Sequence, residues 1–532
     1  MTTSAGTGLT AVNHVVVLML ENRSFDHMLG YLYADAGNVS PSGQPFEGLS
    51  GNESNPDASG SPVNVYQITP STPNAYFMPG ADPGEGYKAT NDQLWGSDSA
   101  PASGTAATMQ GFVKDFAYTI GWETTDKWSI VEGTTADWIM GCFTPQALPV
   151  LSALAKGYAV CDHWFASAPT ETLPNRAFAL AGTSQGHMDD TTKTYTCPSI
   201  FGTLTNAGVS WMVFGYNAQP LTKSDFPDIT GADPSHFGLF TDFQAAAAAG
   251  TLPAFTFLEP SWSSTGNSQH PNYDVALGEQ LIHDTYEALR SGPGWDQTLF
   301  VLTYDEHGGC YDHVPPPWGA TPPDNTAGEF GFGFDRFGVR VPTLLISPLI
   351  APGTVYRVPA GSMPLDHTSV LKTVEERWNL RPLTARDAAA PAFGDVLTLT
   401  SPRTDDVLAG VTVPVSGSAG PSAGQVSHLE AIREELVARY SPAPRSAAPA
   451  ADGTALAVGG TVPAVDGTVP AADGTGLAAD GTGLAADGIG LAALGTAPVV
   501  QDPDMRPPQG AAPLAVVGTA PIVQDPDERP DS

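Results

Sequence analysis

An apolar run that leads directly into acids and histidines stands at Leu299-Phe-Val-Leu-Thr-Tyr-Asp-Glu-His-Gly-Gly-Cys-Tyr-Asp-His-Val-Pro-Pro-Pro317. Residues 299–303 predict a short buried strand, and Asp305 and Glu306 follow at its carboxyl end. In open α/β sheets, ligands bind outside that edge. Two adjacent acids with two histidines nearby cost free energy to hold together unless they bind a cation. This segment therefore predicts both a sheet and a cation site.

The chain around this run alternates between strand-like and helical patterns from about Val12 to about Arg386. Such alternation is typical of a parallel sheet that is covered by helices. The expected strands are residues 15–20, 211–214, 254–258, 299–303 and 343–346. A helix is expected from about Asp274 to Leu289, because apolar side chains recur there on one side. Residues 30–103 are rich in Gly, Ser, Pro and Asn, and they predict a long loop over the edge of the sheet.

The C-terminal part of the chain has a different composition. A last helix is expected over residues 427–440, where Ser427-x-x-Glu430 forms a capping box. Beyond Ser441, Ala-Asp-Gly-Thr units recur, and 11 acidic residues stand against 3 basic ones. Such a composition cannot bury enough apolar surface to fold. We expect a folded domain over residues 1–400, an extension with a helix over 401–441 and a disordered acidic tail over 442–532.

The charge balance restricts the partners. With 22 basic and 56 acidic residues, the net charge of −34 repels nucleic acid and anionic lipid headgroups, so we expect no nucleic-acid partner. The N-terminus has no signal-peptide pattern, and no apolar run is long enough to span a membrane. We expect a soluble protein, either cytoplasmic or secreted by a route that this sequence does not show. The pattern does not set the oligomeric state.

The four cysteines are Cys142, Cys161, Cys197 and Cys310. Their spacing matches no metal-binding pair, so free buried thiols are the main expectation, and one or two disulfides are the alternative.

A second group of polar residues follows the strand expected at 15–20. Glu21 and Asn22 would stand at its carboxyl end, just before a helix. Taken alone, this pattern is about as often a solvated turn as a site. Together with Asp305 and Glu306, it would bring three carboxylates and an amide oxygen to two strand ends, where uncompensated acids repel each other.

A third group stands at Ala168-Pro-Thr-Glu-Thr-Leu-Pro-Asn-Arg176, before an apparent helix. A threonine at a helix start is most often an N-cap. The same position can instead place a hydroxyl beside a metal, which lowers the pKa of the hydroxyl and makes it a nucleophile.

Four motifs in this order resemble a known family. They are Glu21-Asn-Arg-Ser-Phe-Asp-His27, Thr172-x-Pro-Asn-Arg176, Asp305-Glu-His-Gly-Gly-x-Tyr-Asp-His-Val-Pro-Pro316 and Asp366-His-Thr-Ser369. They resemble the bacterial phosphoesterase family, which contains phosphatidylcholine-preferring phospholipases C and acid phosphatases. The resemblance implies an alkaline-phosphatase-like fold, a three-layer α/β/α sandwich with the site at the carboxyl ends of the strands. The phosphoesterase catalytic domain would then cover residues 1–400.

The resemblance also implies roles for single residues. Glu21, Asn22, Asp305 and Glu306 would hold a divalent cation, and Thr172 would be both its remaining protein ligand and the nucleophile. Thr172 is preferred to Thr170 because the motif has the form hydroxyl-x-Pro-Asn. An all-oxygen shell favours Ca²⁺, Mg²⁺ or Mn²⁺, with Zn²⁺ as an alternative.

The histidines are expected to work on the substrate. His270 resembles the phosphate-contacting histidine of the family, with an ordinary loop histidine as the alternative. His367 would contact the substrate phosphate or a second metal, and either histidine would protonate the leaving alcohol. Asn175, Arg176, His307 and His313 are placed with the substrate-binding residues. For His307 and His313, orientation of the acids is an equal alternative.

One position departs from the pattern. Many relatives have Asp-Pro-x-His where this chain has Asp82-Pro-Gly-Glu85. Glu85 is therefore expected to contact the substrate, and its carboxylate could bind a further cation or favour a positively charged headgroup such as choline.

The expected function is metal-dependent hydrolysis of phosphoric esters through a phosphothreonine, on diesters such as phosphatidylcholine or on monoesters. Sulfatase chemistry is disfavoured because its nucleophile is made from Cys or Ser. A non-catalytic binding or surface module on the same fold is the alternative, and it predicts the loss of some site residues.

Overall fold

The central sheet contains eight strands within residues 8–126, 130–191, 195–417 and 420, which are the residues that the computed structural model describes. Its order is β13-β6-β12-β11-β1-β10-β8-β9. All five strands expected from the sequence lie in this sheet. They are β1 (His14–Leu20), β8 (Trp211–Gly215), β10 (Phe255–Glu259), β11 (Thr298–Tyr304) and β12 (Leu344–Ile346). The other strands of the sheet, β6 (Ala159–Val160), β9 (Phe237–Leu239) and β13 (Thr354–Val355), are too short to leave a periodic pattern.

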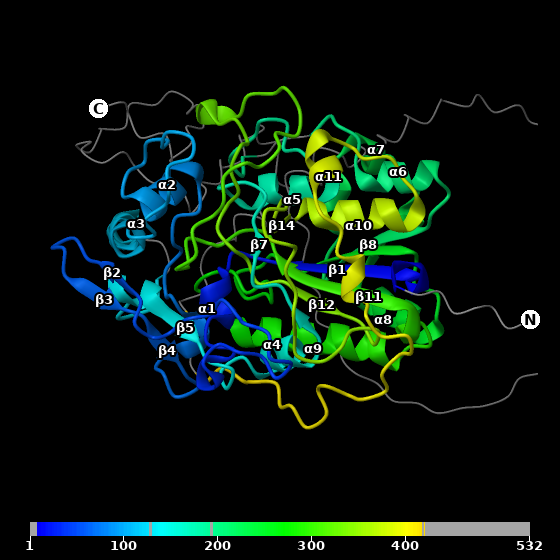
Figure 1. The fold of residues 1–532 in the computed structure, drawn as a ribbon, viewed down its shortest axis with the longest axis horizontal. Helices are drawn as coiled ribbons and strands as arrows, with labels where there is room; N and C mark the ends of the chain where they lie inside the picture. Colours follow the sequence, from blue (N-terminus) through cyan, green and yellow to red (C-terminus); the bar gives the residue numbers. More distant parts are fainter. Residues whose placement is uncertain (1–7, 127–129, 192–194, 418–419, 421–532) are drawn as a thin grey trace, which may run out of the picture. The chain divides into compact units, whose positions relative to one another are not determined.

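Helices cover both faces of the sheet (Figure 1). On one face lie α4 (Pro149–Gly157), α8 (Phe240–Ala249) and α9 (Val275–Ser291). On the other face lie α5 (Thr172–Ala181), α6 (Ile200–Asn206), α7 (Pro227–Thr230), α10 (Thr368–Trp378) and α11 (Ala385–Ala389). Helix α9 confirms the one predicted at 274–289, and the side chain of Asp274 caps its first turn. The predicted fold class, a mixed α/β fold in three layers, is confirmed.

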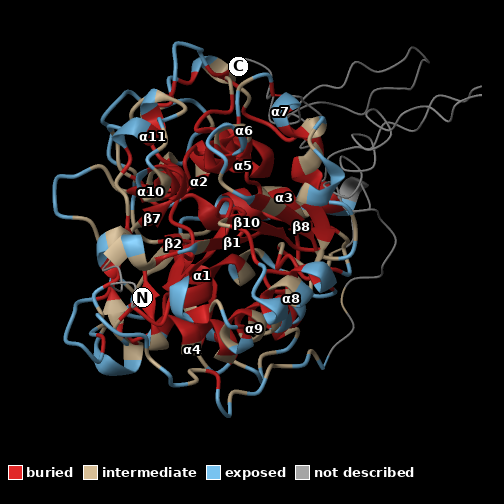
Figure 2. Ribbon diagram, turned by 90° about the vertical axis from the view of Figure 1, so that its right-hand side faces the viewer, coloured by how far each residue is buried: buried red, intermediate tan, exposed pale blue. Residues whose placement is uncertain are grey.

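The core explains why these runs form strands. Every residue of β11 is buried, as are all residues of β1 after His14, because helices cover the sheet on both sides. Figure 2 shows the buried centre, where β1, β8 and β10 lie, and the exposed residues at the periphery.

One strand departs from the expected parallel arrangement. Strands β8, β10, β1 and β11 are parallel, but β12 is antiparallel to β11 and to β6. The reason lies in the connection. Residues 305–343 extend from the carboxyl end of β11 and re-enter the sheet as β12, so a strand that starts at that edge runs in the opposite direction. The apolar run at 343–346 indicates a strand, but it does not indicate whether that strand is parallel or antiparallel to its neighbours.

Residues 30–103 are more structured than the predicted loop. They contain β2 (Ser54–Pro56), β3 (Pro62–Asn64), β4 (Tyr66–Ile68) and α2 (Tyr87–Trp95). Strand β4 pairs with β5 (Gly141–Phe143), and α2 contacts α3 (Phe112–Asp126). Together with α3 and the segment before β5, residues 30–103 form a separate small core, which includes Leu49, Leu94, Phe112 and Ile139. It lies beyond the carboxyl end of β1, on the left of Figure 1. The remaining elements are α1 (Phe25–Leu29), β7 (Trp164–Phe165) and β14 (Leu365–Asp366).

The predicted helix at 427–440 and the predicted tail at 442–532 lie outside the described residues. Residues 401–417 contain no helix or strand within the described part of the extension. The domain boundaries stay predictions. All four cysteines are free thiols; Cys197 is half-buried and the other three are buried.

Candidate active site

Two neighbouring strand ends place the first acids of the site. Strands β1 and β11 are parallel, and Leu20 pairs with Tyr304, so Glu21 and Asp305 follow at equivalent positions. The Asn22 N–H donates a hydrogen bond to Asp305 Oδ1 over 2.9 Å, and the Glu306 N–H donates to the same oxygen over 2.8 Å. The sequence therefore predicted correctly that these two segments meet, because parallel strands end at a common edge.

Thr172 is the first residue of α5 and is buried. Its hydroxyl donates a hydrogen bond to Asn22 Oδ1 over 3.0 Å. The hydroxyl of Thr170 instead donates to the carbonyl of Met188. Of the two threonines, the structure thus joins Thr172 to the predicted metal ligands.

Arg176 follows Thr172 by one helical turn and lies on the same side of α5. Its guanidinium donates to Asp305 Oδ2 over 2.9 Å and to the carbonyls of Met19 and Leu20 over 3.1 Å. The guanidinium carbon lies 4.5 Å from the centre of the Trp262 ring. Arg176 therefore holds helix α5 against the ends of β1 and β11.

Asn175 is fully buried and holds the segment before α5. Its side-chain oxygen accepts from the Ala168 N–H, and its Nδ2 donates to the carbonyls of Ala168, Thr170 and Glu171. These contacts, like those of Arg176, lie within the protein. The substrate-binding roles predicted for Asn175 and Arg176 stay predictions, and their contacts hold the start of α5, where Thr172 lies.

His367 contacts the backbone of Asp305. Its Nε2 is 2.5 Å from the carbonyl oxygen of Asp305, and its Nδ1 is 3.4 Å from Trp164 Nε1. Burial lowers the pKa of His367 to about 4. A buried, neutral imidazole with both nitrogens engaged is suited to fix the Asp305 backbone. The proton-donor role predicted for His367 stays untested.

His307 and His313 have separate surroundings. His307 lies between Glu306 Oε2, at 3.2 Å, and Gln93 Oε1, at 2.7 Å, and burial lowers its pKa to about 3. His313 Nδ1 lies 2.5 Å from Asp26 Oδ2. Both histidines therefore contact acids, which fits the orienting alternative, and their substrate contacts stay predictions.

His270 is brought together with Glu85 and Asp82. One ligand atom from each of these three residues lies within 4.8 Å of the other two. The Asn22 amide Nδ2 also donates a hydrogen bond to Glu85 Oε2, which joins this group to Thr172 through a single amide. Asp82 was part of the quoted motif but was not predicted as a site residue.

Two glycines make this arrangement possible. A Cβ added to Gly308 would lie 2.0 Å from the carbonyl oxygen of Asn22, and one added to Gly309 would lie 2.5 Å from the carbonyl oxygen of Gly84. Both glycines have positive φ, of +60° and +59°. Only glycine lets the 305–309 segment pass between Asn22 and Pro83 at this separation.

The predicted metal ligands are four buried acidic or amide side chains and one hydroxyl. Burial, together with the charge of Asp305, raises the pKa of Glu21 to about 8, and burial also raises the pKa of Asp305. A divalent cation would stabilise both ionised acids, and the all-oxygen donors fit a hard ion. The carboxylates of Glu21, Asp305 and Glu306 do not form one of the two compact candidate metal groups found among the described residues. Glu306 Oε2 instead accepts from the Gly308 N–H over 2.7 Å.

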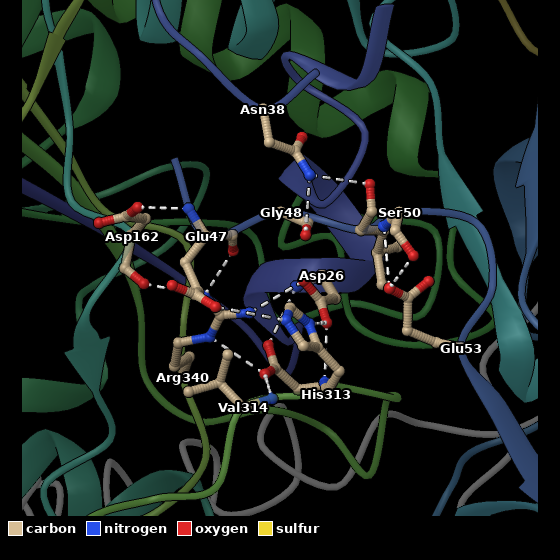
Figure 3. Close-up of polar contacts among 12 residues, drawn as sticks. Asp26, Asn38, Glu47, Gly48, Ser50, Glu53, Asp162, His313, Val314 and Arg340 are labelled. Carbon is tan, nitrogen blue, oxygen red and sulfur yellow. Dashed lines mark hydrogen bonds and ion pairs between the residues drawn. The ribbon is translucent and has the colours of Figure 1, made fainter. Parts of the chain in front are cut away.

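The other compact group contains Asp26, Asp312 and His313. Here the Arg340 guanidinium supplies the positive charge, since its Nη2 lies 2.9 Å from Asp26 Oδ1 and its Nε lies 3.0 Å from Asp312 Oδ1 (Figure 3). Arg340 Nη1 also donates to the carbonyls of Glu47 and Asp162. This cluster is a buried salt-bridge network that joins α1 to the segment after the site acids.

Sequence reasoning missed several residues that hold the site. Arg23 lies inside the first motif, and its guanidinium donates to the carbonyls of Met78, Gln269 and His270. Gln93 contacts His307, Asp115 and the carbonyl of Gly84. The motif could have indicated Arg23, whereas nothing in the local sequence marks Gln93.

In the described part of the chain, no helix has both the length and the apolar character needed to cross a membrane. Residues 12–381 match the profile of the Phosphoesterase family. The chain is 37% identical over 414 residues to non-specific phospholipase C6 of Arabidopsis thaliana, with 74% of each protein covered. It is 27% identical over 419 residues to phospholipase C A of Mycobacterium tuberculosis, with 70% of this chain and 74% of the relative covered.

Among solved structures, the chain is similar to a protein in the alkaline phosphatase superfamily from Vibrio parahaemolyticus. It shares 14% identity and a TM-score of 0.30, and the match covers 47% of this chain and 65% of that one. The family profile extends over most of the chain and includes all four motifs. The chain belongs to the phosphoesterase family and is a hydrolase that acts on phosphoric esters.

Proposed function

We propose that the protein is a metal-dependent phospholipase C that cleaves phosphodiesters such as phosphatidylcholine through a covalent phosphothreonine on Thr172. This proposal rests mainly on the hydrogen bond from the Thr172 hydroxyl to Asn22 Oδ1, which lies among the buried acids at the ends of β1 and β11. The two relatives described above are phospholipases C, which favours diesters over monoesters. Phosphomonoesters are the second substrate class.

Glu21, Asn22, Asp305, Glu306 and Thr172 would hold the cation. Bound there, a divalent cation supplies Lewis-acid chemistry, which lowers the pKa of a coordinated hydroxyl and neutralises charge on phosphoryl oxygens. Ca²⁺, Mg²⁺ and Mn²⁺ are favoured by the oxygen donors, and Zn²⁺ is the alternative.

The reaction has two displacements. Thr172 Oγ1 loses its proton to solvent and forms a bond to phosphorus, while the bond from phosphorus to the leaving alcohol oxygen breaks. A histidine gives that oxygen a proton, a role typically worth about a hundredfold or more. We assign it to His270, because His367 is buried against Asp305 and Trp164. Water then forms a bond to phosphorus and gives a proton to His270, while the bond from phosphorus to Thr172 Oγ1 breaks and Thr172 Oγ1 takes a proton from solvent.

The test compares p-nitrophenyl phosphorylcholine with p-nitrophenyl phosphate, each with and without EDTA. We expect turnover of the diester to exceed that of the monoester and to stop with EDTA. A diester reaction quenched in acid should contain a peptide that carries the phosphorylcholine group on Thr172, identified by mass spectrometry. Preference for the monoester would overturn the substrate assignment, and that group on another residue would overturn the nucleophile.

A further inference from the structure

Asn22 is engaged at both ends of its side-chain amide. Its Oδ1 accepts from the Thr172 hydroxyl, and its Nδ2 donates to the Glu85 carboxylate. Its backbone N–H donates a hydrogen bond to Asp305 Oδ1. Its φ of 55° lies in the left-handed region, where asparagine is tolerated. We propose that Glu85 is a positioning residue that fixes the direction of the Asn22 amide, which goes beyond the proposed function but rests on it.

The chemistry of the two groups makes the direction unique. An ionised carboxylate only accepts hydrogen bonds, whereas an amide group donates through nitrogen and accepts through oxygen. Glu85 therefore selects the rotamer in which Nδ2 faces it. The opposite end, Oδ1, must then face Thr172. Rotation of the amide by 180° would place oxygen against the carboxylate and N–H groups against the nucleophile, so Thr172 and the cation would both lose an oxygen partner.

The backbone around Glu85 is held firmly enough for such a role. Gln93 Nε2 donates to the carbonyl of Gly84 over 2.5 Å, and the Thr90 hydroxyl donates to the carbonyl of Glu85 over 3.1 Å. Gly309 lies directly against Gly84, since an added Cβ there would be 2.5 Å from the Gly84 carbonyl oxygen. The same Gly308-Gly309 segment contacts Asn22. One loop thus sets the separation between Asn22 and Glu85.

Burial strengthens the effect. Asn22 is fully buried and Glu85 is 2% exposed, so their hydrogen bond is shielded from water. Glu85 accepts a hydrogen bond from Asn22, and Asn22 accepts one from Thr172, so Glu85 acts on Thr172 through Asn22.

The group of Asp82, Glu85 and His270 allows two other roles for Glu85, as a ligand of a second cation or as a contact for a cationic headgroup. Both need the negative charge of Glu85. Positioning needs only an oxygen acceptor at that point. The substitution Glu85→Gln removes the charge and keeps an oxygen acceptor, so it separates the three roles.

The experiment compares Glu85→Gln and Glu85→Ala in the full chain. We expect Glu85→Ala to lower kcat by about 10- to 100-fold, as for other residues that orient metal ligands, with KM within about twofold. Glu85→Gln should keep kcat within about threefold, because its amide oxygen accepts the same hydrogen bond. Ca²⁺ or Mn²⁺ binding, measured by calorimetry without substrate, should weaken in Glu85→Ala and be kept in Glu85→Gln.

Three results would overturn the proposal. One is a loss of kcat in Glu85→Gln as large as in Glu85→Ala. Another is the loss of one bound ion per chain in Glu85→Gln, which would indicate a second cation site. The third is a KM increase for p-nitrophenyl phosphorylcholine alone in Glu85→Gln, which would indicate a headgroup contact.

The control variant is Glu375→Gln. Glu375 lies on α10, burial raises its pKa to about 9, and none of its contacts involves the site, so kcat should not change. Thr172→Ala separates this proposal from the proposed function. If Thr172→Ala stays active, the nucleophile is wrong, whereas the effect of Glu85 on cation affinity can still be measured.

Discussion

The hydroxyl of Thr172 and the amide oxygen of Asn22 lie 3.0 Å apart, and their hydrogen bond joins the start of α5 to the turn after β1. These residues are 150 positions apart in sequence. Each belongs to a motif that reads as an ordinary turn or cap when taken alone. Their contact is what makes a nucleophile at Thr172 chemically reasonable.

We expect Thr172→Ala to lower kcat by at least about a thousandfold, because the nucleophile of a covalent mechanism cannot be replaced by a neighbour. Thr170→Val is the matched control, since the Thr170 hydroxyl contacts only the carbonyl of Met188, and it should keep most of the activity. Both are measured on p-nitrophenyl phosphorylcholine, with circular dichroism to show that the variants are folded. Full activity in Thr172→Ala would end the assignment.

Chelation should reduce both activity and stability. If the cation binds only the folded chain, a free concentration of 100 times its dissociation constant stabilises the fold by about 2.7 kcal/mol. We expect EDTA to lower the melting temperature and to stop hydrolysis, and added Ca²⁺, Mg²⁺ or Mn²⁺ to restore both. Asp305→Asn should remove the response of the melting temperature. An unchanged melting temperature in the wild type would contradict a cation held by these acids.

Gly308→Ala should damage the site more than a glycine substitution elsewhere with a similar backbone. An added Cβ at Gly308 would lie 2.0 Å from the carbonyl oxygen of Asn22. At Gly37, φ is a similar +66°, but no atom lies within 4 Å of the added Cβ. Gly37→Ala therefore reports the backbone strain alone. We expect Gly308→Ala to lose much more activity and stability, measured by hydrolysis and urea unfolding. Equal losses would show that the close approach is unimportant.

Removal of Arg340 should be strongly destabilising. Its guanidinium lies 2.9 Å from Asp26 and 3.0 Å from Asp312, and all three side chains are fully buried. Breaking such a network leaves uncompensated buried charge, which costs about 3–5 kcal/mol. Arg340→Met should reduce the free energy of unfolding by that amount. The control Asp405→Asn removes a pair on a side chain that is 55% exposed, and it should cost at most about 1 kcal/mol. A similar effect of both variants would contradict the prediction.

His313 should make stability depend on pH. Burial lowers the pKa of His313, but the hydrogen bond and charge of Asp26 and the charge of Asp312 outweigh burial and the opposing charge of Arg340, so the pKa lies above the ordinary 6.5. Glu47 also lies 3.9 Å from His313 Nε2. A raised pKa in the folded state means that the stabilisation is complete below pH 6.5 and is lost as the pH rises through the folded pKa.

The measurement is the free energy of unfolding of the wild type minus that of His313→Gln, between pH 5 and pH 9. We expect this difference to fall as the pH rises above about 6.5. A difference that grows with pH would show that His313 is neutral in the folded protein.

The sequence by itself determined the sheet-forming runs, the four motif segments and the acids that follow β1 and β11. Apolar runs that end in acids carry this information locally, since parallel strands end at one edge of a sheet. Sequence reasoning did not find the reversed direction of β12 or the folded elements within residues 30–103. Both depend on where a long connection returns to the sheet, which no short pattern records.

Only the tertiary structure decided how the acids and histidines are paired. His367 packs on the Asp305 backbone, Arg340 neutralises Asp26 and Asp312, and Glu85 holds the Asn22 amide. These pairings join residues that are 28 to 314 positions apart, and their energies depend on burial and distance. The sequence shows which groups could take part in chemistry. The folded chain determines which of these groups are charged, which are neutral and which face Thr172.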